Sequence, residues 1–594
     1  MLYHISSKQK AIVMFAVMSA LFLFALDQLI ITTALSKIVE EFQSFSSLSW
    51  IVTAYLLTST IATPIAGKFS DMFGRRLVIL SGVAIFSIAS YFSGASQNIE
   101  QLIVWRAIQG IGGGIITANA FAIIGDLFVP RERGRWQGIF GAVFGIASVV
   151  GPLLGGFLTE PHTVFGLTTD WRWTLWLNVP VGMIVFAIIF FFMPTIKHEK
   201  KPSIDICGSV ILAIILSSIV LAADANDKIF GSLMDASGMS LATIRWILII
   251  FAAIMLGVFI WVEKRVKEPI LSLRFFENYN YRLFTAMLLL NGAAFLGTIL
   301  YITQFNQQVF EASPTTAGLM LLPLVIGLSI SAGICGQIMQ RTGRYKNLMI
   351  AGSLIAMTGI FSLSFLNPQS NYMNEVIIMV VTGVGLGALL PTLNLAVQNE
   401  FAQKDLGTVS ASAQLFRNLG STIGTAIFGG ILTAGIVASI GPLKNIEYIQ
   451  FLQDQPSQAQ KKFDVSNIDT DLALTLNTKD VKKQINQGFT GGLQKAEASA
   501  IQKATESIKA QQLPPQVETK VLQNTTEKIS DSFDNTKNDF KAKQAAFSIR
   551  IINSFSDSLR PIFYAASGLM AAVFLLALSV YETELRSSNE IAKS

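Results

Sequence analysis

The sequence has little of what metalloenzymes and disulfide-rich secreted proteins require. Of its 594 residues, two are cysteine, three are histidine and only 14% are charged. Cys207 and Cys335 support neither a disulfide framework nor a thiolate metal site, and the histidines lack metal-ligand spacing. The glycine-rich "IGGGI" at 111–115 lacks the lysine of a phosphate loop. We therefore expect no enzyme, no metal and no cofactor, which leaves an ion gradient as the energy source.

The chain is rich in apolar residues. Hydrophobic residues make up 52% of it, 42 residues are phenylalanine, and the mean hydropathy is +0.53. This composition is too apolar for a soluble globular protein and indicates a membrane protein. The net charge of +6 comes from short basic clusters between apolar runs, which are typical of topology signals and not of a nucleic-acid interface.

Apolar runs near the ~20 residues needed to cross a bilayer recur along the chain and predict an all-α integral membrane protein. The first follows "SSKQK" without a small-residue cleavage site, so we interpret it as an uncleaved span. The fourteen predicted spans cover 11–35, 48–66, 77–95, 101–125, 136–158, 173–193, 206–223, 244–262, 283–304, 316–338, 348–366, 375–398, 408–436 and 561–581.

Alternate connections are rich in Lys and Arg, which places them in the cytoplasm together with both termini of a multi-pass plasma (inner) membrane protein. Between the last two spans lies a long connection, outside by parity, with helix-forming composition. We expect a helical hairpin or bundle there; a partly disordered loop is the alternative. The predicted division is a six-span bundle (1–198), two inserted spans (199–265), five spans of a second bundle (266–440), the extracytoplasmic insertion (441–559), and a last span with its tail (560–594).

An internal repeat supports two related halves. "GKFSDMFGRR" follows the second span and "GQIMQRTGRYK" follows the tenth, and each has a glycine followed seven residues later by Gly-Arg. Two six-span halves separated by the inserted spans would produce this pattern, and many secondary transporters are built from such repeats.

Asp27 is the most informative residue, because a carboxylate deep in an apolar helix is costly and usually faces a cavity or a partner. It lies 8 residues from the end of the first predicted span, and Arg106 lies 7 residues into the fourth, which runs the other way. Both are therefore at similar depth, about 10 to 12 Å inside. If they meet, a proton and a cationic substrate would compete for Asp27. The alternative is a fixed ion pair that only orients two helices.

The loop after the second span contains a compact set of glycine and ionic residues. We expect it to latch the two halves together and to break as they move; simple positive-inside anchoring is the alternative. Its candidate residues are Gly67, Asp71, Gly74, Arg75 and Arg76.

The fifth span has two pairs of glycines four residues apart and a Gly-Pro step, a pattern typical of close helix contact or a hinge. Its candidate residues are Gly145, Gly151, Pro152, Gly155 and Gly156. Other spans contain polar residues that either line a pathway or, more commonly, form interhelical hydrogen bonds. These are Asn119, Asn291, Gln304, Asn394, Gln414, Arg417 and Asn418.

Together these motifs resemble those of the major facilitator superfamily, and specifically its fourteen-span drug:proton antiporters. The resemblance rests on "GKFSDMFGRR", "LDQLIITTAL", "RAIQGIGGG" and "GIASVVGPLLGG", with "WRWTLWLNVPVG" and "SPTTAGLMLLP" as further signatures. It covers the chain except for the outer segment. The resemblance implies a major facilitator fold with two six-helix bundles and two additional spans.

The resemblance also implies roles. It assigns proton coupling or recognition of cations to Asp27, proton transfer to Arg106, and conformational interconversion to the loop residues. Family members mostly export amphipathic drugs, dyes or biocides, so protons, small amphipathic substrates and membrane lipid are the expected partners, without nucleic acid. Alternatives are export of an endogenous lipid, siderophore or metabolite, or a scaffold that displays the 441–559 segment to an envelope partner.

Overall fold

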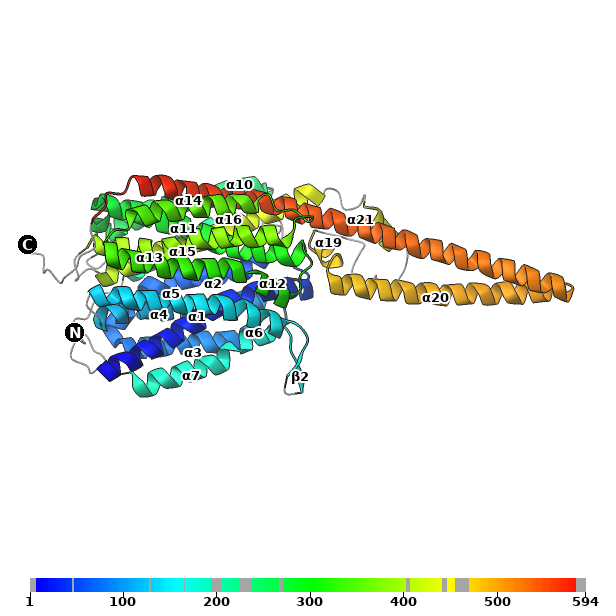
Figure 1. Cartoon of the computed structure of the whole chain (residues 1–594), viewed down its shortest axis with the longest axis horizontal. Coiled ribbons are helices and arrows are strands. Elements are labelled where there is room, and N and C mark those ends of the chain that lie inside the picture. Colours follow the sequence, from blue (N-terminus) through cyan, green and yellow to red (C-terminus); the bar gives the residue numbers. More distant parts are fainter. Residues whose placement is uncertain are drawn as a thin grey trace, which may run out of the picture. The chain divides into compact units, whose positions relative to one another are not determined.

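The computed structural model of the chain is almost entirely helical (Figure 1). It describes residues 7–44, 47–127, 130–164, 166–193, 205–223, 230, 234, 237–266, 269, 271–401, 406–440, 446–454 and 470–583. Among these residues the strands are β1 (Thr163–Val164) and β2 (Leu167–Thr168), which form an antiparallel hairpin. The expected all-α membrane fold is confirmed.

The chain divides into two compact units. Unit 1 comprises Met1–Phe42, Ser47–Thr433 and Ser558–Ser594, and unit 2 comprises Gln43–Ser46 and Ala434–Asp557. The predicted boundary at 559/560 lies two residues from the division between the units at Asp557 and Ser558. The backbone itself is continuous there, because Pro561 does not interrupt helix α21 (Pro515–Leu578).

Unit 1 contains the helices that match the predicted spans. In the first half these are α1 (Ser7–Glu41), α2 (Leu48–Phe73), α3 (Arg75–Gly94), α4 (Ile99–Leu127), α5 (Pro130–Thr159), α6 (Arg172–Trp176) and α7 (Asn178–Phe192). The inserted pair is α8 (Ile206–Ala223) and α10 (Leu241–Glu263). The second half contains η3 (Leu273–Glu277), α11 (Tyr279–Gln308), α12 (Pro314–Met320), α13 (Leu322–Thr342), α14 (Lys346–Leu363), α15 (Tyr372–Asn399), α16 (Leu406–Ile440) and the end of α21.

Twelve helices or helix pairs among the described residues are long and apolar enough to cross a membrane. The other two predicted spans correspond to α5 and α8, whose described apolar stretches are shorter, Val150–Thr159 and Cys207–Ala223. The sixth and tenth predicted spans are each two consecutive helices, α6 with α7 and α12 with α13. The second break precedes Pro323, which has no backbone N–H to donate to the preceding turn.

The two halves of unit 1 pack in parallel layers of helices. α4 packs against α2 and α3, α1 packs against α5, and in the second half α15 packs against α13 and α14. Figure 1 shows the blue and cyan helices of the first half beside the green helices of the second, and contacts of α5 with α12 and α13 join them. α1 begins and α21 ends at the same end of the unit, opposite β1 and β2.

Unit 2 is helical, as expected for the insertion. It contains α17 (Glu447–Asp454), α19 (Thr470–Leu476), α20 (Lys479–Ala510) and the first part of α21. α20 and α21 form an antiparallel hairpin (Figure 1), and the chain turns at "QQLPPQ", where Gln512 has a positive φ of 48°. Stacked and tilted aromatic rings join its helices: Tyr448, Phe451, Phe489, Phe540 and Phe547.

Candidate functional site

Asp27 lies in the middle of α1 and is completely buried, with 0% of its surface exposed. Three side chains donate hydrogen bonds to its carboxylate. The Arg106 guanidinium is 2.7 Å from Oδ2, while the Gln109 and Asn178 amides are 2.9 and 2.7 Å from Oδ1. Its charge is therefore met by one cation and two neutral donors.

Arg106 is buried as deeply as its partner, with 1% exposed. Besides the ion pair, its Nη1 donates to Oε1 of Gln109 at 2.9 Å. Its Cζ lies 4.4 Å from the centroid of the Tyr55 ring, so the guanidinium also has an aromatic face as a partner. The structure thus brings together the two residues that the sequence placed at equal depth.

A second layer of polar groups holds the donors in place. Gln109 and Asn178 both donate to Oγ of Ser90, at 3.1 and 3.0 Å. Ser90 in turn donates to the backbone carbonyl of Leu175 at 2.8 Å. Because these residues come from α3, α4, α6 and α7, the network ties Asp27 of α1 to most helices of the first half.

This arrangement constrains how the charges can move. A buried ion pair that loses one member leaves an uncompensated charge, which costs several kcal/mol. Separating Asp27 from Arg106 therefore costs less when a proton or another cation takes the place of Arg106. The geometry fits both a fixed ion pair that orients two helices and a carboxylate that exchanges its partner during a conformational change.

Sequence reasoning missed four members of this network, although two stood inside quoted motifs. Gln109 follows Arg106 by three residues, which puts both on one face of α4, and Asn178 lies in "WRWTLWLNVPVG". Tyr55 and Ser90 gave no signal, because aromatic and hydroxyl residues are common in spans.

A second buried carboxylate, also missed, lies in the other half. Glu375, in the first turn of α15, is fully buried. The Asn306 side chain of α11 lies beside its carboxylate, but neither oxygen makes a hydrogen bond of normal geometry among the described residues. The sequence gave no signal for it, because Glu375 is the first residue of the predicted span 375–398, and a charged residue at the end of a span is common.

The two halves are closed against each other at the end of unit 1 that bears β1 and β2. Gln307 of α11 donates to the backbone oxygen of Thr33 at 3.0 Å, and Ser36 of α1 donates to Gln304 at 3.1 Å. The backbone N–H of Thr315 donates to Glu160 at 3.3 Å. Thr33 follows Asp27 by six residues on α1, so these contacts lie between the Asp27 site and that end.

The glycines of the fifth span make this closure possible. Gly151 and Gly155 face α1, and a Cβ at Gly155 would stand 2.6 Å from the Ile30 carbonyl oxygen. Gly156 faces the backbone of Thr315 in α12, where any side chain would collide with main-chain atoms, and the Pro152 carbonyl lies against Gly318. Gly145 lies in α5, but its surroundings are outside the described residues. α5 therefore contacts both the Asp27 helix and the opposite half.

Comparison with known proteins identifies the architecture. The sequence profile of the Major Facilitator Superfamily matches residues 17–425. The chain belongs to the Major Facilitator Superfamily. It is therefore a membrane transporter and not an enzyme.

Named relatives of this transporter include two from Bacillus subtilis. It is 33% identical over 479 residues to "Multidrug transporter protein MdtP", a match that covers 79% of this chain and 84% of the relative. It is 34% identical over 410 residues to "Multidrug resistance protein 3", covering 69% and 77%. Among solved structures, a bacterial homologue of the human lysosomal transporter Spinster, inward-facing and unoccupied, aligns with a TM-score of 0.52 at 15% identity, covering 93% of this chain and 99% of that one. This last likeness concerns the fold alone.

The transporter's loop after α2 has a defined backbone. Gly74 separates α2 from α3 with φ 90° and ψ 145°, a conformation that favours glycine. Arg75 is buried and donates to Oγ of Ser70 at 2.8 Å, while Arg76 donates to the Phe190 carbonyl of α7. The two arginines thus point to different helices.

The remaining loop residues are only partly described. Gly67 lies in α2 with open space beside it, and the side chain of Asp71 is outside the described residues. At the repeated loop, Gly343 ends α13 with a positive φ of 70°. Both glycines of the repeated spacing therefore have a positive φ, but their turns differ, because ψ is 6° at Gly343 and 145° at Gly74.

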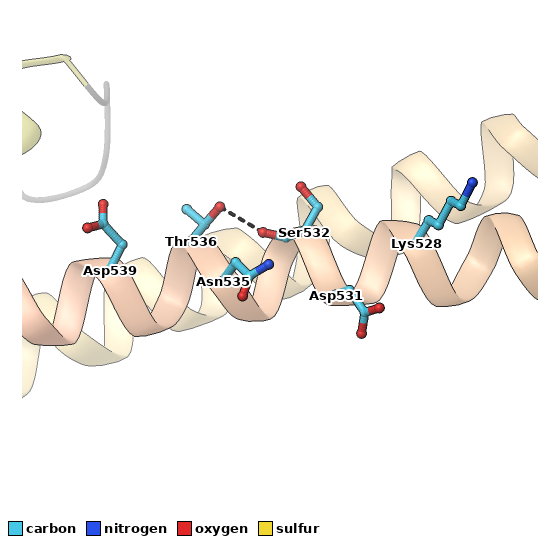
Figure 2. Close-up of a pocket in the computed structure, with 6 residues that line it drawn as sticks. All are labelled: Lys528, Asp531, Ser532, Asn535, Thr536 and Asp539. Carbon is cyan, nitrogen blue, oxygen red and sulfur yellow. Dashed lines mark hydrogen bonds between the residues drawn. The ribbon is translucent and has the colours of Figure 1, made fainter.

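Unit 2 has a shallow polar hollow along α21. Figure 2 shows the residues that line it, all of which belong to this one helix. Thr536 donates to the backbone oxygen of Ser532 at 2.9 Å, a bond internal to the helix. The lining side chains are mostly exposed, and their charges are those of a solvated helix face, so we assign no chemistry to the hollow. They are Lys528, Asp531, Ser532, Asn535, Thr536 and Asp539.

Proposed function

We propose that this transporter exports amphipathic, often cationic, drugs or biocides in exchange for protons, by alternating access. One observation carries the proposal: a fully buried carboxylate, Asp27, whose charge is met by Arg106 inside the first helical bundle. Such a residue is the expected place for a coupling ion, because its charge state and its contacts must change together. The names of the Bacillus relatives support multidrug substrates.

In the proposed cycle, the halves close at the end bearing β1 and β2 while the opposite end opens to the cytoplasm, where both termini lie. A proton that reaches Asp27 releases Arg106, and departure of that proton restores the ion pair. Substrate and proton use Asp27 in turn. The loop of Gly67, Asp71, Gly74, Arg75 and Arg76 latches the cytoplasmic end during the exchange.

The localisation completes the proposal. We place the transporter in the plasma membrane, with unit 2 on the outer side, where an envelope partner can reach its helical hairpin. If unit 2 only docks such a partner, deletion of 445–550 leaves proton-driven transport in vesicles intact.

The decisive test uses inverted membrane vesicles with an imposed pH gradient and ethidium as the cationic dye. Wild type should accumulate ethidium when the lumen is acidic and should lose it when a protonophore collapses the gradient. Asp27→Asn removes the exchangeable proton but retains the size of the side chain, so gradient-driven uptake should fall to the level of empty vesicles. The matched control is Glu100→Gln, which changes an exposed carboxylate at the start of α4 and should transport like wild type.

Undiminished uptake by Asp27→Asn at equal protein level would falsify the assignment of the coupling carboxylate. Uptake that ignores the pH gradient in the wild type would refute proton antiport itself.

A further inference from the structure

An arginine in the second half of the molecule is left without a counter-charge. Arg417 lies 11 residues after Leu406, the first residue of α16, which corresponds to about 16 Å along the helix. Among the described residues it has neither an ion pair nor a hydrogen bond, and no carboxylate lies near enough to act on it. A charged side chain within a span normally pairs or faces a water-filled cavity.

The contrast with Arg106 shows how unusual this is. Arg106 is within hydrogen-bonding distance of Asp27 and Gln109 and lies on the Tyr55 ring. Arg417 lies deep in unit 1, where burial desolvates it, yet the residue is partly exposed, so accessible space lies beside it. Five N–H donors in a planar fork suit an oxyanion better than any other ligand class.

The surroundings of Arg417 on α16 are polar and offer donors. Gln414, one turn earlier, is 5% exposed and donates its amide to Oδ1 of Asn418 at 2.9 Å. That bond uses the acceptor of Asn418 and leaves its Nδ2 without an acceptor among the described residues. Ser421, one turn later, continues the polar face and donates to the Gly292 carbonyl of α11 at 3.0 Å.

The neighbouring face of α16 is apolar, so the polar residues are confined to one side of the helix. Leu415 and Leu419 belong to an apolar cluster with residues of α8, including Ile211 and Leu216. Charge and amides are therefore gathered on one side of the helix and aliphatic packing on the other. Helix packing alone does not require a cation on the polar side.

We propose that Arg417 binds the anionic group of an amphipathic ligand, such as a carboxylate, sulfonate or phosphate, with Asn418 as a neighbouring amide donor. This inference deepens the proposed function. It rests on that function in one respect, namely that the bound ligand is a transported substrate. It extends the cargo from cations to amphiphiles that carry an acidic group. A lipid headgroup and a free amphiphile share this chemistry, so the experiment separates them.

The test is equilibrium binding in nanodiscs of neutral phosphatidylcholine, with two probes that differ only in charge. They are fluorescent NBD-dodecanoate and its methyl ester, measured by anisotropy against empty nanodiscs. Wild type should bind the acid at least about tenfold more tightly than the ester, the effect expected of one charged hydrogen bond. Arg417→Gln should reduce this ratio to about one, and Arg417→Lys should retain part of it. Arg344→Gln, an exposed arginine, is the matched control and should keep the full ratio.

Further arms keep the outcomes separate. If phosphatidylglycerol added to the nanodiscs competes with the acid, the anion comes from lipid; if it does not, the site selects free amphiphiles. An unchanged acid-to-ester ratio in Arg417→Gln overturns the proposal, as does a wild-type ratio near one. If Arg417→Gln does not fold, Arg417→Lys and Asn418→Leu, which removes the second donor, must lower the ratio. The binding assay applies no pH gradient, so a failure of proton-driven ethidium uptake would not affect the acid-to-ester ratio. Equally, a failure of anion binding would not affect the uptake result.

Discussion

A double-mutant cycle on Asp27 and Arg106 gives the most direct measure of the coupling between them. The single variants are Arg106→Gln and Asp27→Asn. Arg106→Gln leaves the carboxylate buried with only the neutral donors Gln109 and Asn178, which should cost about 3 to 5 kcal/mol of unfolding free energy. Asp27→Asn leaves the buried Arg106 cation without its counter-charge, with only Gln109 and the ring of Tyr55 as partners, so this loss should also be about 3 to 5 kcal/mol.

The double variant removes both charges and leaves neither uncompensated. It should therefore lose clearly less than the two single variants together, by a coupling energy of about 2 to 3 kcal/mol. Solvent screening should not reduce this coupling energy, because the side chains of Arg106 and Asp27 are only 1% and 0% exposed.

The assay is equilibrium unfolding in mixed micelles, in which SDS is added to the dodecylmaltoside-solubilised protein and tryptophan fluorescence is recorded. A matched cycle on Arg172 and Glu41, an ion pair of 2.8 Å with 19% and 43% exposed side chains, should give a coupling below about 1 kcal/mol. Additive losses at Asp27 and Arg106, within about 0.5 kcal/mol, would refute the view that the buried pair acts as a unit.

Two further predictions concern packing and pH. Gly156→Val should lower the free energy of unfolding by about 1 to 3 kcal/mol in the same assay and should abolish dye uptake in vesicles, because a side chain would collide with the Thr315 backbone. The control is Gly257→Ala, because Gly257 has open space around it. An equal loss of stability in both variants would contradict the close-contact explanation. In unit 2, burial raises the pKa of Tyr448 to about 12 from 10.0. The folded state therefore holds this proton longer than the unfolded state, so stability should be constant below pH 10 and fall between pH 10 and 12, by up to about 3 kcal/mol. Tyr448→Phe removes this pH dependence, together with the hydrogen bond from Gln544; parallel pH profiles of the two proteins would disprove the assignment.

The apolar runs were sufficient to place the helices, because burial in lipid requires long apolar segments with satisfied backbone hydrogen bonds. The breaks at 177 and 321 inside two runs were missed, since hydropathy does not report a local interruption of helical hydrogen bonding. The helical nature of the long insertion followed from its composition. The change from polar to apolar sequence near 560 indicated the division between the two units. It did not show that a single helix, α21, continues across this division, because composition does not report where a backbone helix ends.

The sequence alone determined the depth of Asp27 and Arg106, because an α-helix rises a constant 1.5 Å per residue and depth follows from counting. Rotation about the helix axis and the choice of neighbouring helices do not follow from counting. Only the tertiary structure decided that Gln109 and Asn178 complete the shell of Asp27, and that Arg417 has no counter-charge within the described part of the chain. The physical reason is that these contacts join helices distant in the chain, and the packing of the whole bundle sets how each helix is turned.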